Sequence, residues 1–300
     1  MSKNSHPGLI KCDGFTLDAS TSPYIYTVSG QTWTANEYQD KFLKVGTQYF
    51  AIMSNTSTNM HSYVGKAAGT EIWDFDTIIS LDNDDFNTTL KHPNGNAQLS
   101  FEELTIDASS YNLTIYNSNT ELVLKDIKIQ SKNNRIEPQS DKITMTRAHL
   151  VVSTGPGIDD DAYDWYTTYN GVSVRKSGIK GSNGIYVTNN RLFKDIYVEN
   201  FTYGFYLSYG NYMGNQSSTE MIIGNCTYAF GLRNSTLISF PVIKPYLDTV
   251  NYTFGGLETI EFGTKVYINT LYGTPDVSMF HSSVAITTTD PSVDIVYVGV

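Results

Sequence analysis

The sequence predicts an all-β chain: a right-handed parallel β-helix (a solenoid of stacked coils) with a small β-rich N-terminal module. A piece with the order Asn, apolar, Thr, aromatic, small begins at Asn200 and recurs at Asn225 and Asn251, at spacings of 25 and 26 residues. A period in the twenties indicates a repeat architecture. The copies are rich in β-branched and aromatic residues, and neither a leucine-rich consensus nor a useful amphipathic helix separates them. Each copy is therefore interpreted as one coil of a parallel β-helix.

The repeated asparagines predict a structural ladder along one corner of the solenoid. Asparagine tolerates left-handed backbone angles, and its side chain can bond to neighbours in a stack. We therefore expect Asn200, Asn225 and Asn251 to occupy equivalent corners. A second recurrence, Lys-Asp-Ile-Lys-Ile and Lys-Asp-Ile-Tyr-Val, places Asp126 and Asp195 69 residues apart, which corresponds to three coils of 23 residues.

The chain divides into three predicted regions. Residues 1–22 are polar and form an N-terminal arm, and residues 23–95 form a small β-rich attachment module with alternating apolar residues and turns. The turn-forming sequence Pro-Asn-Gly-Asn at residues 93–96 marks the boundary. Residues 96–300 then form the β-helix, which ends in a C-terminal cap because a solenoid would otherwise expose its last coil.

Composition excludes some partners and favours others. The formal net charge of -10, with no basic run, argues against nucleic acid. No stretch approaches ~18 apolar residues, so we expect no membrane insertion. The first 14 residues also lack the apolar segment of a secretion signal. The 22 tyrosines and only 17% charged residues are typical of extracellular, virion and carbohydrate-binding proteins.

An acidic and aromatic loop at residues 155–166 is the first candidate site. Carboxylates beside aromatic rings are what glycoside hydrolysis requires, namely an acid, a base or nucleophile, and a surface on which sugars stack. The weak catalytic candidates are Asp159, Asp160 and Asp164, and the glycan-binding candidates in this loop are Trp165 and Tyr166. A solvated loop without chemistry remains an equal alternative.

A calcium site and further sugar contacts are also open to this sequence. Oxygen-rich spacing leaves calcium as an alternative at Asp82 and Asp84, or at Asp159 and Asp161, although the complete calcium-binding loop is missing. No metal or other cofactor is otherwise predicted. Tyr206 and Tyr209 follow core positions in the repeat and would face outward, where rigid rings suit sugar or protein contact.

The Asn corners, the Asp-Ile coils and the Tyr/Asn/Thr-rich composition resemble pectate-lyase-like right-handed β-helix proteins. The Gly157-x-Asp159-Asp160 sequence is similar to part of polygalacturonase-type hydrolases, but the G-H-G and R-I-K motifs of those enzymes are missing. With a separate N-terminal module and an apolar C-terminal end, the chain looks most like a viral or phage appendage of tailspike or head-fibre type.

This resemblance implies a virion protein that docks to other virion proteins through residues 1–95, forms a homotrimer and contacts a cell-surface glycan. An extracellular or cell-surface location is the alternative. Two other functions stay open: a polysaccharide hydrolase or lyase that uses the loop at 155–166, and a purely architectural particle component. The sequence favours a non-enzymatic protein without deciding the question.

Overall fold

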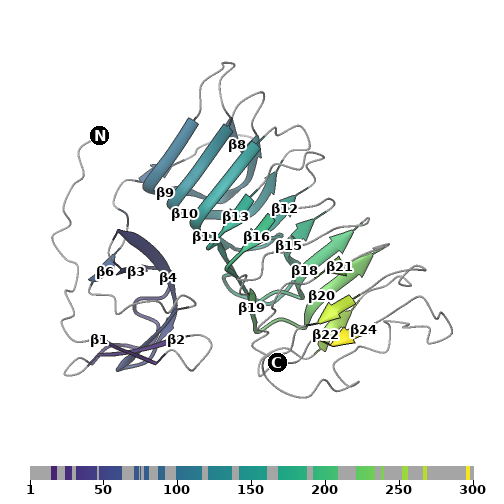
Figure 1. The fold of residues 1–300 in the computed structure, drawn as a ribbon. Coiled ribbons are helices and arrows are strands. Elements are labelled where there is room, and N and C mark those ends of the chain that lie inside the picture. Colours follow the sequence, from purple (N-terminus) through teal and green to yellow (C-terminus); the bar gives the residue numbers. More distant parts are fainter. Residues whose placement is uncertain are drawn as a thin grey trace.

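The computed structural model is all-β in its described part and contains two main groups of strands (Figure 1). It describes residues 15–18, 24–28, 32–45, 47–62, 71–73, 75, 78–80, 87–91, 99–116, 121–136, 142–160, 168–187, 192–208, 221–233, 238–239, 252–255, 266–268 and 295–297. Within these ranges, no helix has the length and apolar character needed to cross a membrane. The predicted fold class, a parallel β-helix with a small β-rich N-terminal module, is confirmed.

The N-terminal module is a six-stranded sheet with antiparallel neighbours. Its strands, in spatial order, are β1 (Phe15–Asp18), β2 (Tyr24–Val28), β5 (Asn59–Ser62), β4 (Gln48–Asn55), β3 (Phe42–Val45) and β6 (Glu71–Trp73). Apolar residues of β3 and β4, including Leu43 and Ile52, are fully buried and provide the core of the module. β3 and β4 form a hairpin in which Val45 pairs with Gln48.

The solenoid begins with short strands that pair with a long one. β7 (Ile78–Ser80) and β8 (Asn87–Lys91) both pair in parallel with β9 (Leu99–Tyr116). β9, β10 (Glu121–Ile136) and β11 (Lys142–Val152) are long because each continues around a corner. The division of the chain near residue 96 stays a prediction.

Later coils break into shorter strands that stack on the long ones. They are β12 (Ile158–Asp160), β13 (Thr168–Asn170), β14 (Ser173–Lys176), β15 (Asn183–Val187), β16 (Leu192–Lys194), β17 (Ile196–Glu199), β18 (Tyr203–Ser208), β19 (Met221–Gly224), β20 (Tyr228–Arg233) and β22 (Tyr252–Gly255). A separate parallel group contains β21 (Ile238–Ser239), β23 (Val266–Ile268) and β24 (Ile295–Tyr297).

The strand pairs define three faces of the solenoid, all with parallel register. The first face contains β13 and β16 with the N-terminal parts of the long strands. The second face continues from the middle of the long strands through β14, β17 and β19. The third face runs from β12 through β15, β18 and β20 to β22. Apolar side chains from all three faces fill a common core.

The corner between the first and second faces repeats in every coil from β9 to β17. Its residues share a positive φ, between 49° and 67°: Glu103, Asp126, Arg147, Gly171 and Asp195. Asp126 and Asp195 are thus three coils apart, with Arg147 and Gly171 at the intervening corners. Arg147 pairs with the carboxylate of Asp126 through Nε and Nη2, at 2.6 and 2.7 Å. This ion pair stabilises two residues that hold unfavourable backbone angles.

The corner between the second and third faces carries the asparagines. Asn200 and Asn225 have φ values of 70° and 47°. Asn225 Nδ2 donates to Asn200 Oδ1 at 3.1 Å, and Asn200 Nδ2 donates to the carbonyl oxygens of Lys176 and Gly178 at 2.9 Å. The Asn200 side chain therefore satisfies two backbone carbonyl groups where the strands turn, and Asn225 extends the ladder by bonding to the Asn200 side chain. Asn251 lies outside the described residues.

Gly184 of β15 lies one coil before Gly204, the small residue of the first copy of the repeat, at a closely packed position of this corner. Phe201 and Cys226 follow the asparagines and are fully buried. A Cβ placed on Gly184 would lie 3.2 Å from the Phe201 ring and 2.5 Å from the carbonyl oxygen of Gly204. Burial raises the pKa of the Cys226 thiol to about 12, so Cys226 is an apolar core residue and not a reactive thiolate.

The N-terminal module packs against the second face of the solenoid. Tyr197 of β17 joins a cluster with Phe42, Tyr49, Ala51, Met53 and Phe75 from the N-terminal part of the chain. Phe42 also meets the ring of His149 in a T-shaped contact with centroids 6.1 Å apart. The module is therefore fixed to the solenoid by apolar contacts as well as by the polar contacts described below.

Candidate functional site

Four tyrosines gather on the outer side of the third face. Strand register places Tyr203 beside Tyr228 and Tyr186 beside Tyr206. The rings of Tyr203 and Tyr228 stack with centroids 4.9 Å apart, and those of Tyr186 and Tyr206 stack at 5.6 Å. Tyr203 and Tyr206 meet edge to face at 5.2 Å, which joins the two stacks. We call these four residues the tyrosine face.

Gly231 makes room for the tyrosine face. It lies opposite Tyr206 in the β18–β20 pair and is buried. A Cβ at this position would lie 2.5 Å from Tyr206 Cδ2 and 2.7 Å from Tyr203 Cδ1. Because such contacts are far inside van der Waals distance, the rings of Tyr206 and Tyr203 can pack against β20 in this arrangement only when residue 231 is glycine. The arrangement of the face is therefore set by the backbone beneath it.

The tyrosine face offers apolar ring surface and neutral hydroxyl groups. Its four side chains are partly exposed. Burial, together with the neighbouring Tyr228 and Tyr206, raises the pKa of Tyr203, so its hydroxyl stays protonated at neutral pH. Rings with a polar edge on a rigid strand make contacts at low entropic cost. Tyr206 was predicted from the sequence, whereas Tyr209 lies outside the described residues.

The predicted acidic site separates into an inner and an outer carboxylate. Asp160 is fully buried and accepts a hydrogen bond from the hydroxyl of Tyr169 at 2.7 Å. Asp159 precedes it on β12, is partly exposed and lies opposite Tyr186 of β15. Because alternate residues of a strand point to opposite sides, these two carboxylates do not face one substrate. Asp160 is occupied as a core hydrogen-bond acceptor.

Several predicted residues lie outside the described part of the chain: Asp82, Asp84, Asp161, Asp164, Trp165 and Tyr166. Among the residues that the structure does describe, no group of three or more His, Cys, Asp or Glu side chains could hold a metal ion. The calcium alternative stays untested.

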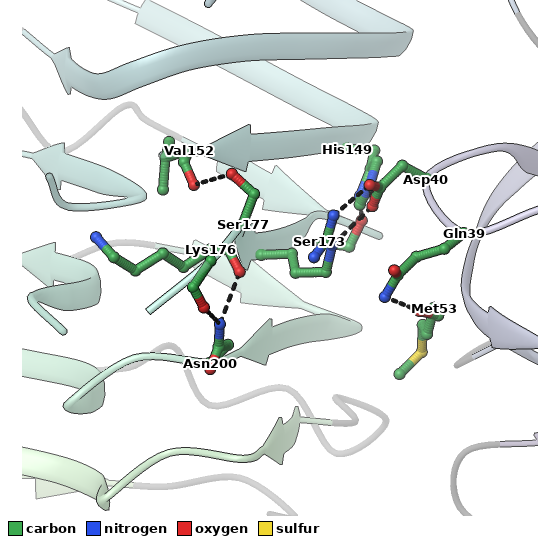
Figure 2. A network of polar contacts seen from close by, with 11 residues as sticks. Gln39, Asp40, Met53, His149, Val152, Ser173, Lys176, Ser177 and Asn200 are labelled. Carbon is green, nitrogen blue, oxygen red and sulfur yellow. Dashed lines mark hydrogen bonds and ion pairs between the residues drawn. The ribbon is translucent and has the colours of Figure 1, made fainter. Parts of the chain in front are cut away.

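A second polar cluster, not predicted from the sequence, joins the module to the solenoid (Figure 2). His149 Nε2 lies 2.9 Å from Asp40 Oδ1, and His149 Nδ1 lies 2.7 Å from Ser173 Oγ. Arg175 Nε donates to Asp40 Oδ1 at 2.8 Å, and its Nη2 donates to Asp40 Oδ2. Asp40 comes from the module, and the other three come from β11 and β14 of the second face. We call these four residues the clasp.

Strand register explains how the solenoid presents its half of the clasp. His149, Ser173 and Tyr197 occupy equivalent positions on β11, β14 and β17, and Arg175 lies opposite Glu199. Asp40 closes the cluster from a turn in which its φ is 65°. This cluster could not be predicted from sequence spacing, because Asp40 is separated from His149 by 109 residues and from Arg175 by 135 residues.

The electrostatics of the clasp follow from its burial. Burial opposes ionisation of Asp40, but the hydrogen bond from His149 and the hydrogen bonds and positive charge of Arg175 outweigh it and hold the pKa of that carboxyl well below its usual value. Burial lowers the pKa of His149, and Lys128 and Arg175 act in the same direction against the opposing effect of Asp40. At neutral pH the clasp therefore pairs an ionised Asp40 with a neutral His149.

A Ser–His–Asp set invites comparison with hydrolases, but its exposure points to a different role. The Ser173 side chain is fully buried, and His149 is 2% exposed. A nucleophile must reach substrate, and the Ser173 hydroxyl is fully buried and bonded to His149 of β11. The clasp is therefore a structural contact that holds the module on the second face.

Comparison of the chain with protein-family models, with curated proteins and with solved structures finds no significant match. The class of the protein is accordingly defined by its own fold: it is a parallel β-helix protein with an N-terminal β module held on one face.

Proposed function

We propose that this chain is a non-enzymatic attachment protein of a viral or phage appendage, in which the tyrosine face contacts a cell-surface glycan. The observation that carries the proposal is the pair of tyrosine stacks on the outer side of a rigid solenoid. The stacks need no reorganisation before a ligand arrives, because the strands and Gly231 hold them in place. Pre-ordered rings lose little entropy on binding.

The electrostatic character of the face supports a sugar ligand. Tyrosine rings cover the apolar C–H surfaces of a sugar, and the hydroxyls exchange hydrogen bonds with sugar hydroxyls. Asp159, opposite Tyr186 on the next strand, adds a carboxylate acceptor at one end of the face. A net charge of -10 disfavours binding to nucleic acid.

The division of labour is part of the same proposal. Residues 1–95 dock to other proteins of the particle, and the chain assembles as a homotrimer. In support of this division, the module contacts the second face, whereas the tyrosine face belongs to the third. Binding to the particle and binding to a glycan then use different surfaces of the same chain.

Cleavage of the glycan is the alternative that the described carboxylates disfavour. Asp160 is withdrawn into the core and bonded to Tyr169. A general acid or base must come within hydrogen-bond reach of its substrate, which the buried side chain of Asp160 cannot do. The proposal is therefore binding without cleavage.

The test is binding of the wild-type chain to a panel of capsular, cell-wall and pectic polysaccharides, with product analysis for released oligosaccharides. We expect binding without release. Tyr206→Ala should weaken binding at least about tenfold, which corresponds to 1.4 kcal/mol. Gly231→Val should weaken it as well, because the added side chain displaces the Tyr206 and Tyr203 rings.

Tyr111→Ala is the matched control. Tyr111 is a partly exposed tyrosine of β9 outside the tyrosine face, so its removal should leave binding unchanged. Absence of binding to any glycan, or equal losses for Tyr111→Ala and Tyr206→Ala, would contradict the proposal. Release of oligosaccharides that is abolished in Asp159→Asn would instead support the enzyme.

A further inference from the structure

The clasp contains a histidine whose surroundings depend on its protonation state. His149 lies at the contact between the N-terminal module and the solenoid, with Asp40 on one side and Ser173 on the other. It is 2% exposed, so water cannot replace a partner that it loses.

The neutral imidazole satisfies all the partners at once. With the proton on Nε2, His149 donates to the Asp40 carboxylate, and the Ser173 hydroxyl donates to the unprotonated Nδ1. A second proton on Nδ1 makes this nitrogen a donor. The Ser173 hydroxyl must then turn its own proton away, and this fully buried group needs a different acceptor.

The charges around His149 oppose a second proton in the same way. Asp40 is already paired through two bonds with Arg175 of β14. Lys128 of β10 and Arg175 both face the imidazole with positive charge. The negatively charged groups nearby are Asp40 of the module and Glu199 of β17, and Glu199 acts on Arg175. A protonated His149 thus adds a third positive charge to a buried cluster that has one carboxylate in direct contact with it.

We propose that His149 is a proton-sensitive latch: its protonation on acidification releases the N-terminal module from the second face of the solenoid. The event is a proton transfer from solvent to Nδ1 of His149, with loss of the hydrogen bond from Ser173. Release exposes Phe42 and Phe75 of the module and Tyr197 of β17, which the closed state buries. The latch would let an acidic environment change the relative position of the two parts without a protease or a ligand. This inference does not depend on the proposed glycan contact.

The direction of the pH dependence follows from the burial of His149. Burial lowers the pKa of His149 in the closed state below its usual value, and Lys128 and Arg175 contribute to this shift. The closed state therefore binds fewer protons than the open state, and its stability is fully present above about pH 6.5, the usual pKa of histidine. The stability of the closed state is lost as the pH falls from there toward the lowered pKa. Asp40 stays ionised in this range, because its pKa is held well below the usual value.

The experiment follows the separation of module and solenoid between pH 8 and pH 4.5. Small-angle X-ray scattering reports the overall dimension, hydrogen exchange reports protection of residues 36–45, and circular dichroism verifies that the strands remain. We expect the wild-type radius of gyration to rise, and protection of this segment to fall at least about tenfold, with a midpoint below about pH 6.5. Both changes should occur while the β-sheet signal is retained.

Variants separate the latch from general acid unfolding. His149→Gln keeps an N–H donor for Asp40 and carries no titratable proton, so its module should stay closed throughout the range. His61→Gln is the control, because His61 is a half-buried histidine of β5 bonded to Ser54 within the module. It should open as the wild type does.

Ser173→Ala gives a second, independent readout. It removes the donor to Nδ1 and thereby the bond that favours the neutral imidazole. The midpoint of opening should move to higher pH in this variant, because the neutral form of the closed state loses a bond that the protonated form does not have. A wild-type module that stays closed at pH 4.5, or a His149→Gln variant that opens at the wild-type midpoint, overturns the inference.

Discussion

Asp40 and Arg175 are 135 residues apart in the chain and form a two-bond ion pair, in which Arg175 Nε donates to Asp40 Oδ1 at 2.8 Å. Their side chains are 17% and 14% exposed, so the pair is largely removed from water. A pair of this kind stabilises a fold only while both partners are present, because either charge left alone is buried without compensation. This relationship makes the position of the module dependent on one residue of the solenoid.

Asp40→Asn should destabilise the chain by about 3 kcal/mol, because it leaves the Arg175 guanidinium without its counter-charge. Equilibrium urea unfolding at pH 7.5 measures the loss. Glu102→Gln is the matched control, since Glu102 pairs with Lys125 at 3.0 Å but the two side chains are 47% and 40% exposed. That substitution should cost less than about 1 kcal/mol. Equal effects of the two changes would show that the Asp40 pair does not hold the module.

Glu199→Gln should stabilise the protein at pH 8 by about 1 kcal/mol, the scale of an unsatisfied buried acceptor. Glu199 Oε2 is buried and has no hydrogen-bond partner among the described residues. Burial raises the pKa of Glu199, against the opposing effects of Tyr197 and Arg175. A carboxyl with a raised pKa favours the folded state at low pH and loses that contribution as the pH rises through the folded pKa.

The stability gain of Glu199→Gln should therefore be largest at pH 8 and shrink toward pH 4. Thermal unfolding of both proteins across this range measures it. A loss of stability at pH 8 would mean that attraction to Arg175 exceeds the cost of burying the carboxylate. A gain that is constant with pH would show that the ionisation of Glu199 is not the cause.

The parts of the fold that repeat could be predicted from the sequence. Asn200 and Asn225 are 25 residues apart and occupy the same corner of successive coils, where both have positive φ. Asp126 and Asp195 likewise occupy one corner three coils apart. A stacked coil imposes the same backbone angle on each copy, and few residue types accept that angle, so the repetition becomes visible in the sequence.

The contacts that occur once could not be predicted in this way. The first corner also contains Glu103 and Arg147, which share no residue type with Asp126, so its complete course is hidden. Asp40 and His149 meet only because the module packs on the second face, and no periodicity reports that packing. Asp160 resembled a solvated carboxylate, but Tyr169 of β13 supplies a hydroxyl that allows it to be buried.

Asn225→Gly and Asn225→Ala should separate the two contributions of the corner asparagine. The glycine variant loses the bond from Asn225 Nδ2 to Asn200 Oδ1 but accepts the φ of 47°, so we expect a cost of about 1 kcal/mol. Alanine loses the same bond and strains the backbone by about 1 kcal/mol more. Urea unfolding of both variants measures the difference. An alanine variant as stable as the glycine variant would be inconsistent with a strained corner.

Gly184→Ala should destabilise the solenoid by about 2–3 kcal/mol, in the range of an overpacked core. The added Cβ would lie 2.2 Å from Val198 Cγ1 and 2.5 Å from the carbonyl oxygen of Gly204, and backbone on the next coil cannot move aside without breaking its strand pairing. Gly181→Ala is the control three residues away, because its Cβ would meet no atom within 4 Å. Thermal unfolding of the two variants should show a clear loss for Gly184→Ala and almost none for Gly181→Ala. If both melt at the wild-type temperature, the coils are not packed closely enough at this corner to require glycine at position 184.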